Sequence, residues 1–366
     1  MKSARSVRIF TGISIATLAI SAISALAFGT VSASITKIDA FAGIDKRPDK
    51  KSSAINYLLV GSDTREGLTK AELKELRVGS VATAAGKRSD TMLLVHISKA
   101  RDKAVLVSIP RDTFALIPAH LNKAGKTIPA VHSKINSAFN WGGAPLLIQT
   151  IEEMTQLKID HYVEVNFAGF ASVIDSLGGI EVCTKKDIDD PKSHLVLPAG
   201  VHTLNGIEAL KYVRTREFDG MGDIGRMQRQ QAFMSSVLKK ATSAGVLLNP
   251  ITMTSFINSS LAAVTTDEGL KNSDLITLAK QMKSLATSNV RTLTVPLSNL
   301  NYYANGVTAS VLWDPVLAPE LWDRLREDRA VIDEVTPSPS PSSTKSAEVE
   351  IVDKFKTRTA EDNICR

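Results

Sequence analysis

Three short apolar runs between residues 56 and 110 constrain the fold of this chain more than its other features. NYLLVG, TMLLVHIS and AVLVSIP are rich in Leu, Val and Ile, alternate little with polar residues, and end at Gly61, Lys99 and Pro110. Such runs are typical of central strands that are buried on both faces of a sheet. The compact polar turn KARDK joins the second run to the third, so we expect these two strands to form a hairpin.

Helical patterns alternate with strand patterns after these runs. GGAPLLIQTIEEMTQL, which starts at Gly142, has its large apolar residues at helical spacing. HYVEVNFAGFASVIDSLGGIEV then predicts a strand over 162–165, a helix that ends at a Gly-Gly pair, and another strand. Strands interleaved with helices predict an α/β fold, here a three-layer αβα sandwich with a mixed central sheet.

The remaining C-terminal part of the chain divides into three regions. Residues 250–330 suggest two or three more helices and a strand at VRTLTVP, packed onto the same domain, which we therefore place at 55–332. The Pro/Ser-rich segment around TPSPSPSSTKS cannot form a core and predicts a linker over 333–347. The tail over 348–366 returns to a mixed composition.

The N-terminal segment predicts a membrane anchor. Residues 9–28 carry no charged side chain, and their length is close to the roughly 20 residues that a membrane-spanning helix needs. Lys and Arg in residues 1–8 predict that this end stays in the cytoplasm and that the rest is exported. A cleaved signal peptide is the alternative, but the apolar run exceeds the usual core of about 7–15 residues. Residues 29–54 then form a stalk.

The two cysteines, Cys183 and Cys365, suggest a disulfide bond. An exported chain lies where disulfides persist, and a free exposed thiol near an exported C-terminus is a liability. Two unrelated thiols are the alternative.

The overall composition excludes few functions. A hydrophobic fraction of 43% indicates a folded protein, and a formal charge of +6 suits nucleic acid, anionic lipid or an anionic substrate equally well. The sequence contains no G-x-S-x-G motif and no P-loop, and its six histidines lack metal-ligand spacing. The distribution of charge is therefore more informative than its sum.

The stretch YVRTREFDGMGDIGRMQRQQ contains four arginines. Arg214 and Arg216 are two residues apart, so both side chains point the same way if this segment is extended. Arg226, Arg229 and Gln230 have the spacing that places them on one face of a helix. Guanidinium groups stay charged and match carboxylates and phosphates. We expect an anion site here, and a solvated basic helix face is the alternative.

Three further segments place an Asp and an Arg beside the end of a predicted strand: GSDTR at 61–65, RSDT at 88–91 and PRDT at 110–113. Strand ends are where α/β folds build ligand sites, although each segment alone also fits a local turn in which Asp pairs with Arg. Arginines together with Asp63 and Asp90 suit a diphosphate that Mg²⁺ bridges to the carboxylates. Displacement at phosphorus would need positioning and charge neutralisation, with no covalent nucleophile.

Residues 55–245 carry an ordered series of motifs. In chain order they are NYLLVGSDTREG, RSDTMLLVHI, SIPRDT, KINSAFNWGG, IDHYVEVNFAGF, SLGGIEV, LNGIEALKYVRTR and GDIGRMQRQQ. This series resembles the LytR-CpsA-Psr family of cell-envelope proteins. The resemblance implies a membrane-anchored phosphotransferase outside the cytoplasm. Such an enzyme transfers a glycopolymer from a polyprenyl diphosphate to peptidoglycan, as a phosphodiester, and releases polyprenyl phosphate. It also implies an apolar tunnel for the lipid.

The resemblance also assigns roles to individual residues. Asp63 and Asp90 are expected to hold Mg²⁺ or another divalent cation such as Mn²⁺, and Asp90 is a candidate base for the acceptor hydroxyl, a role that stays open. Residues expected to take part in catalysis, besides Asp90, are Arg111, Arg214, Arg216 and Arg226. Residues expected to bind the substrate are Arg65, Arg88, Arg229 and Gln230.

Two features separate the chain from the shortest family pattern. GLTKAELKELRVGSVATAAGK lengthens the loop between the first two motifs, which makes the placement of Asp63 against Asp90 the least certain contact. The cysteine pair and the TAEDNIC ending look like actinobacterial members of the Gram-positive family, whose donor is expected to be an arabinogalactan or another phosphate-linked polymer.

Two other functions compete with transfer. A nucleic-acid-binding regulator fits the positive charge, but the anchor places the domain outside the cytoplasm and carboxylates accompany the basic residues. We therefore expect no nucleic acid partner. A non-catalytic binder of polyprenyl phosphate or glycopolymer would use the same arginines without any transfer.

Overall fold

The fold is seen in a computed structural model. It describes residues 35–65, 67–76, 89–122, 124–216, 222–241, 256, 259, 262–271, 274, 289–335 and 350–359.

Within these residues, the central sheet has eight strands. In spatial order they are β1 (Thr36–Ile38), β14 (Val264–Asp267), β9 (His161–Val165), β2 (Ile55–Ser62), β3 (Ser89–Ile97), β4 (Ala104–Ile109), β15 (Val290–Thr294) and β20 (Arg358–Thr359). β2 is parallel to β9 and antiparallel to β3, while β3 and β4 form the expected hairpin. The predicted mixed sheet is therefore confirmed.

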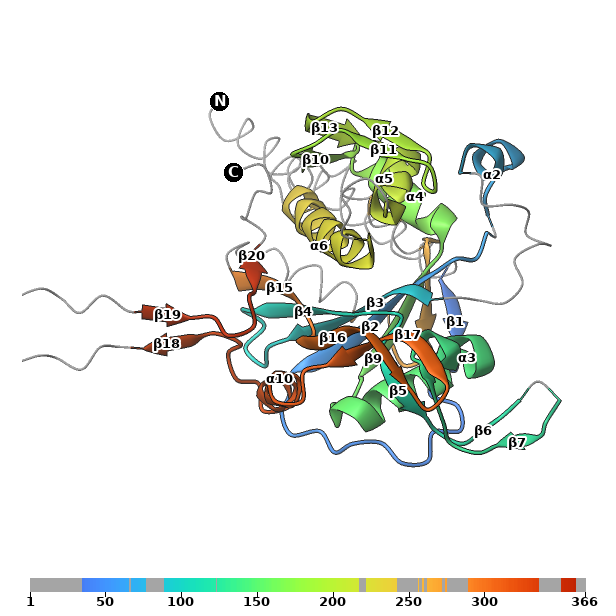
Figure 1. The fold of residues 1–366 in the computed structure, drawn as a ribbon, viewed down its shortest axis with the longest axis vertical. Helices are drawn as coiled ribbons and strands as arrows, with labels where there is room; N and C mark the ends of the chain where they lie inside the picture. The colour runs from blue at the N-terminus through green and yellow to red at the C-terminus, as the bar shows by residue number, and fades with distance from the viewer. Residues whose placement is uncertain are drawn as a thin grey trace, which may run out of the picture.

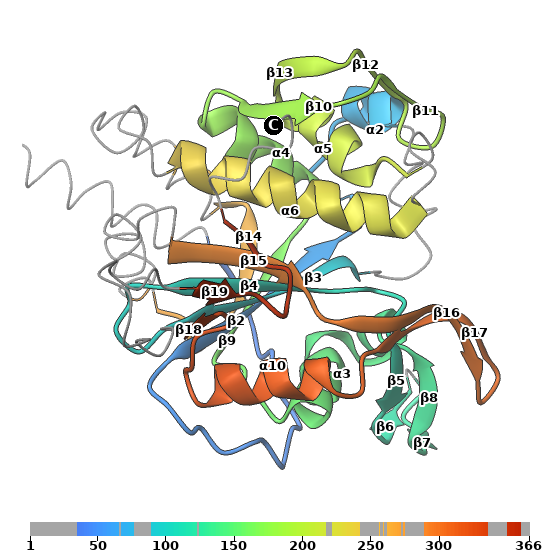
Figure 2. The same cartoon turned by 60° about the vertical axis from the view of Figure 1, so that its left-hand side comes forward.

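Helices cover both faces of the sheet (Figure 2). On one face lie α3 (Asn136–Thr155) and α10 (Leu317–Arg326), whose apolar side chains join those of β2, β3 and β4 in the largest core cluster. On the other face lie α4 (Phe167–Ser176), α5 (Gly206–Arg214) and α6 (Gly222–Ala241). The buried runs predicted from sequence thus form the middle of the sheet because both of their faces are covered.

Side chains at the helix starts explain where α4 and α5 begin. The side chain of Asn166 accepts a hydrogen bond from the backbone N–H of Gly169 at 2.7 Å. Asn205 and Glu208 form a capping box, in which each side chain accepts from the other residue's backbone N–H at 2.9 and 3.0 Å. These bonds satisfy N–H groups that a helix cannot pair internally.

Short hairpins surround the three layers (Figure 1). Beside α4 and α5 lie β10 (Ile180–Thr184) with β13 (Gly200–Leu204), and β11 (Ile188–Asp190) with β12 (Leu195–Leu197). On the α3 side, β5 (Phe114–Ile117) pairs with β8 (Val131–Lys134), and β6 (His120–Leu121) pairs with β7 (Thr127–Ile128). The remaining elements are α2 (Lys70–Leu76), the β16 (Leu297–Ala304) and β17 (Val307–Trp313) pair, and the β18 (Asp333–Val335) and β19 (Glu350–Val352) pair.

The region after residue 250 contains more strand than expected. The strand at VRTLTVP is confirmed as β15, but the sequence analysis missed the β16–β17 hairpin. Its turn has positive φ at Asn305 (51°) and Gly306 (78°), the backbone that Asn-Gly favours in two-residue hairpins. Of the two or three helices expected over 250–330, α10 is present, and most of residues 250–288 lie outside the described residues.

Three segments expected to lie outside the domain contribute to it. β1, in the expected stalk, pairs with β14, and Ala40 is fully buried. The first residues of the expected linker form β18, and β20 of the tail pairs with β15. The predicted anchor at 9–28 and Cys365 lie outside the described residues. Among the residues that are described, no helix has the length and apolar character to cross a membrane.

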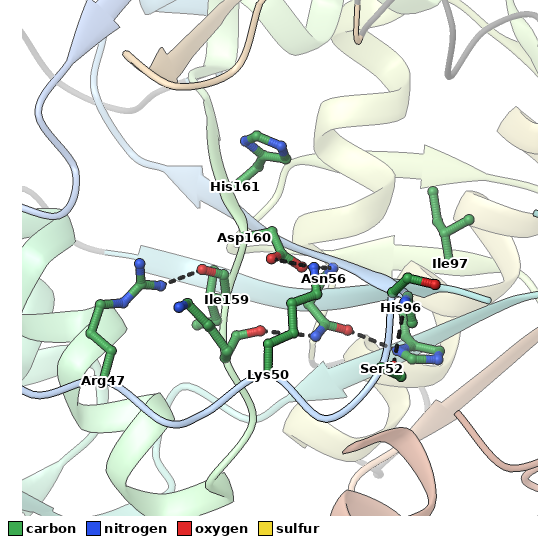
Figure 3. Close-up of polar contacts among 12 residues, drawn as sticks. Arg47, Lys50, Ser52, Asn56, His96, Ile97, Ile159, Asp160 and His161 are labelled. Atoms are coloured by element: carbon green, nitrogen blue, oxygen red, sulfur yellow. Dashed lines mark hydrogen bonds and ion pairs between the residues drawn. The ribbon is translucent and has the colours of Figure 1, made fainter. Parts of the chain in front are cut away.

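Polar contacts attach the segment that was expected to be a stalk to α3 and to the residues just before β9 (Figure 3). Arg47 donates two hydrogen bonds to Glu152, at 3.0 and 2.6 Å, and a further one to the carbonyl of Ile159. The Glu152 side chain is 2% exposed and also accepts from the Ile159 backbone N–H at 2.8 Å. Lys50 pairs with Asp160 at 2.6 Å, but that pair is more exposed.

We expect Arg47→Ala to lower the free energy of unfolding by about 2–4 kcal/mol, because it leaves the buried Glu152 carboxylate without its cation. The matched control Lys50→Ala should cost less than about 1 kcal/mol, because its ion pair is solvent-exposed. Urea unfolding of both variants measures the difference. Equal, small losses would show that Arg47 does not anchor this segment.

Candidate functional site

The strand register gathers the predicted Asp and Arg segments at one edge of the sheet. Ser62 at the end of β2 is opposite Ser89 at the start of β3, and Met92 of β3 is opposite Ile109 at the end of β4. Asp63 directly follows β2, Arg111 follows β4 after Pro110, and Asp90 is the second residue of β3. Asp90 and Arg111, which are 27 and 48 positions after Asp63 in the sequence, therefore approach the same edge of the sheet as Asp63.

A cavity of about 520 Å³ lies between this part of the sheet and helices α4, α5 and α6. The sheet contributes Leu59, Leu93 and Val163, and the helices contribute aromatic and aliphatic side chains such as Phe170 and Phe233. The lining is thus mainly apolar, and the cavity has the size and character of a site for an apolar ligand.

Cationic and polar side chains line the cavity where it meets the sheet edge. They are Ser62, Thr91, Asn166, Lys192, Arg214, Arg216, Arg226 and Gln230. Arg226 and Gln230 belong to the first half of α6, whereas Phe233, Met234 and Val237 further along the same helix line the apolar part. The cavity therefore changes from cationic to apolar along α6, which suits an amphipathic ligand with an anionic head.

Packing at the α5–α6 junction holds the arginines in place. The Arg214 guanidinium lies 5.4 Å from the centre of the Phe167 ring, a cation–π arrangement. Gln230 donates to the carbonyl of Val213 at 3.1 Å, and Arg229 donates to the carbonyl of Thr215. Arg226 and Arg229 are 5% and 7% exposed, so this face of α6 is buried rather than solvated. Arg229 does not line the cavity.

Asp190 is a residue that the sequence analysis missed and that positions part of the candidate site. Its carboxylate is 1% exposed and accepts hydrogen bonds from the backbone N–H groups of Lys192 and Ser193, both at 2.8 Å, and of Arg216. It therefore positions two of the cationic residues of the cavity. The dipeptide Asp190-Pro191 could have indicated this turn, because an Asp before Pro favours a turn that is closed by the Asp side chain.

The other predicted residues lie in the loops after β2 and β4 or outside the described part of the chain. Asp63 and Arg65 are half-buried in the loop after β2, and Arg111 pairs with Asp112 at 3.4 Å. None of these three lines the cavity. Arg88 lies outside the described residues, as does the side chain of Asp90. The predicted metal pair therefore stays a prediction.

The donors available for a metal are oxygens at the sheet edge. Asp63 and Asp90 belong to adjacent strand ends, and two carboxylates are a donor set that suits a hard divalent cation. Groups of three or more His, Cys, Asp or Glu that could enclose a metal by themselves do not occur among the described residues.

Tyr212 lies behind the arginines and is buried. Burial raises the pKa of its phenol, and the charge of Arg229 opposes this only in part. Tyr212 is therefore neutral at physiological pH and is not a proton acceptor.

Similar proteins have names that refer to the bacterial cell wall. The probable cell wall biosynthesis protein LcpB of Corynebacterium glutamicum is 36% identical over 276 residues, which cover 75% of this chain and 62% of that protein. The polyisoprenyl-teichoic acid–peptidoglycan teichoic acid transferase TagT of Bacillus subtilis is 35% identical over 204 residues, covering 54% and 56%. This chain thus spans about three-fifths of the length of these relatives.

Solved structures share the fold. The structure described as TagT bound to LIIa-WTA has a TM-score of 0.56 at 26% identity and covers 79% of this chain and 98% of its own. The LytR-Csp2A-Psr enzyme from Actinomyces oris has a TM-score of 0.59 at 22% identity, covering 80% and 95%, and supports the fold alone. The model of the LytR_cpsA_psr family matches residues 26–318, so this chain belongs to the LytR-CpsA-Psr family.

Proposed function

We propose that this protein transfers a glycopolymer from a polyprenyl diphosphate carrier to peptidoglycan and joins the two through a phosphodiester. The observation that carries the proposal is the cavity of about 520 Å³ that is apolar inside and lined by Lys192, Arg214, Arg216 and Arg226 at the sheet edge. Relatives named as teichoic acid transferases support it.

The two parts of the cavity match the two parts of such a donor. The polyprenyl chain occupies the apolar part, where it leaves water, and the diphosphate lies against the guanidinium groups. Several fixed cations around one diphosphate neutralise the negative charge that would repel an incoming oxygen.

The reaction follows from this placement. An acceptor hydroxyl attacks the phosphorus that carries the glycopolymer, a new P–O bond forms, and the bond to the lipid phosphate breaks. The arginines hold the diphosphate and neutralise the leaving polyprenyl phosphate. Mg²⁺ held by Asp63 and Asp90 would add positive charge at the diphosphate, and Asp90 is the candidate to receive the hydroxyl proton.

A direct test measures release of polyprenyl phosphate by the full chain in detergent, from a synthetic polyprenyl diphosphate sugar with an acceptor glycan present. We expect release that depends on a divalent cation, and a loss of about 100-fold or more in Arg226→Ala, because charge neutralisation at phosphorus is lost. The control Arg329→Ala removes an exposed arginine that pairs with Glu327 and should keep full activity.

Other outcomes separate the alternatives. Tight donor binding without release would identify a non-catalytic binder. Release that persists at full rate without divalent cations would remove the metal from the proposal. Parallel losses of activity and thermal stability in Arg226→Ala would indicate a structural ion-pair network instead.

A second test fills the apolar part of the cavity. Val173→Trp places a large ring where the lipid chain is proposed to lie, so KM for a long-chain donor should rise about tenfold or more while KM for a short-chain donor changes little. Val196→Trp adds the same ring at a residue that is 75% exposed and should affect neither donor. Equal effects of Val173→Trp on both donors would argue against a lipid in this cavity.

We further propose that residues 9–28 anchor the chain in the membrane, that the domain lies outside the cytoplasm, and that Cys183 of β10 is bonded to Cys365. Peptide mapping without reduction should recover the two cysteines in one linked fragment from protein made in an exporting host. Alkylation of both thiols in that protein would contradict the disulfide.

A further inference from the structure

An aromatic surface lies beside the sheet edge, on the side opposite the cavity. It is formed where the β5–β8 hairpin contacts the β16–β17 hairpin (Figures 1 and 2). Phe114 stacks on His132, with ring centres 5.0 Å apart, and meets the edge of Tyr302 at 5.2 Å. Leu116 is opposite His132 and is 47% exposed. We call these four residues the twin-hairpin face.

Hydrogen bonds connect this face to the loop that carries Arg111. The backbone N–H of Val311 donates to the carbonyl of Asp112 at 2.8 Å, and the Trp313 indole N–H donates to the Thr113 hydroxyl at 3.2 Å. Thr113 is fully buried. Phe114 directly follows Thr113 in the chain. The face therefore has a fixed position relative to the sheet edge that carries Asp63 and Arg111.

Two basic side chains lie next to the face. Arg111 and Lys134 contact the same carboxylate, that of Asp112, at 3.4 and 3.2 Å. Lys134 is paired with Phe114 across the β5–β8 hairpin. A ligand that covers the rings would therefore meet a cationic border on the side of the reaction centre.

Displacement at phosphorus requires the nucleophile and the leaving group on opposite sides. In the proposed function the leaving lipid phosphate extends into the cavity on the α4–α6 side of the sheet. The twin-hairpin face lies on the α3 side, since α3 packs against β5 and β8 (Figure 2). A molecule held there approaches the sheet edge from the side that the nucleophile needs.

We infer that the twin-hairpin face binds the acceptor glycan, an inference that rests on the proposed function. Sugar rings have apolar faces whose C–H groups pack against the electron-rich faces of aromatic rings. The carboxylates of peptidoglycan complement Arg111 and Lys134. The face thus holds a run of sugars and presents one hydroxyl to the diphosphate.

The test compares KM for the acceptor with KM for the donor, in the full chain in detergent. Phe114→Ala removes the central ring of the face, and Leu116→Glu adds a negative charge at a half-exposed residue that can change without loss of the fold. We expect KM for a soluble peptidoglycan glycan oligomer to rise about tenfold, while KM for the donor, measured at saturating acceptor, stays unchanged. Val201→Glu, at an exposed residue of β13, is the matched control for added charge.

Three results would overturn the inference. The first is acceptor KM within twofold of wild type in both variants. The second is an increase in KM for the donor, which would assign the face to the donor polymer. The third is a difference in oligomeric state between the variants and the wild type, measured by sedimentation, which would make the face an interface between two copies of the chain.

Failure of the proposed function gives a different pattern. If the wild type neither releases polyprenyl phosphate nor transfers the glycan, the transferase proposal fails. Direct titration of the glycan oligomer into the same variants then still tests the face, with weaker binding expected in Phe114→Ala and Leu116→Glu than in Val201→Glu. Unchanged binding would overturn the inference.

Discussion

The hydrogen-bonded register of β2 determines where the rest of the site lies. β2 pairs with β3 on one side and with β9 on the other, so its end brings Asp63, Asp90 and Asn166 to one edge of the sheet. The pairing shifts between Gly61 and Ser62, where a Cβ on Gly61 would lie 3.3 Å from that of Thr91. A side chain at Gly61 would press on the neighbouring strand where the site begins.

Two features of different origin meet at this edge. The apolar cavity results from helices that span the sheet without filling the space above β2, β3 and β9. The cationic side chains of the cavity come from the α5–α6 junction and from the β11–β12 turn, and the buried carboxylate of Asp190 accepts hydrogen bonds from both segments. Burial strengthens each of these electrostatic contacts because little water competes for them. A single amphipathic site arises although neither half of it is contiguous in sequence.

Sequence reasoning was most successful where one pattern had one physical explanation. The apolar runs became β2, β3 and β4, because runs without alternation are stable only when covered on both faces. The arginines of α5 and α6 were identified by spacing, but their burial was not, because a basic helix face looks the same whether it meets water or a cavity. β16–β17 was missed although Asn305-Gly306 marks its turn, since its exposed strands, unlike β2, carry no continuous apolar run.

By itself, the sequence determined the central strands β2, β3 and β4, the mixed sheet, the family, and the arginines Arg214, Arg216 and Arg226 of the cavity. These follow from local periodicity and from motifs that are read along the chain. Only the tertiary structure decided that Lys192 and Asp190 belong to the site, that Arg229 faces the backbone of Thr215, and that Thr36–Ile38 completes the sheet. Those outcomes depend on long-range pairing and on the space left between packed layers, and no local pattern encodes either.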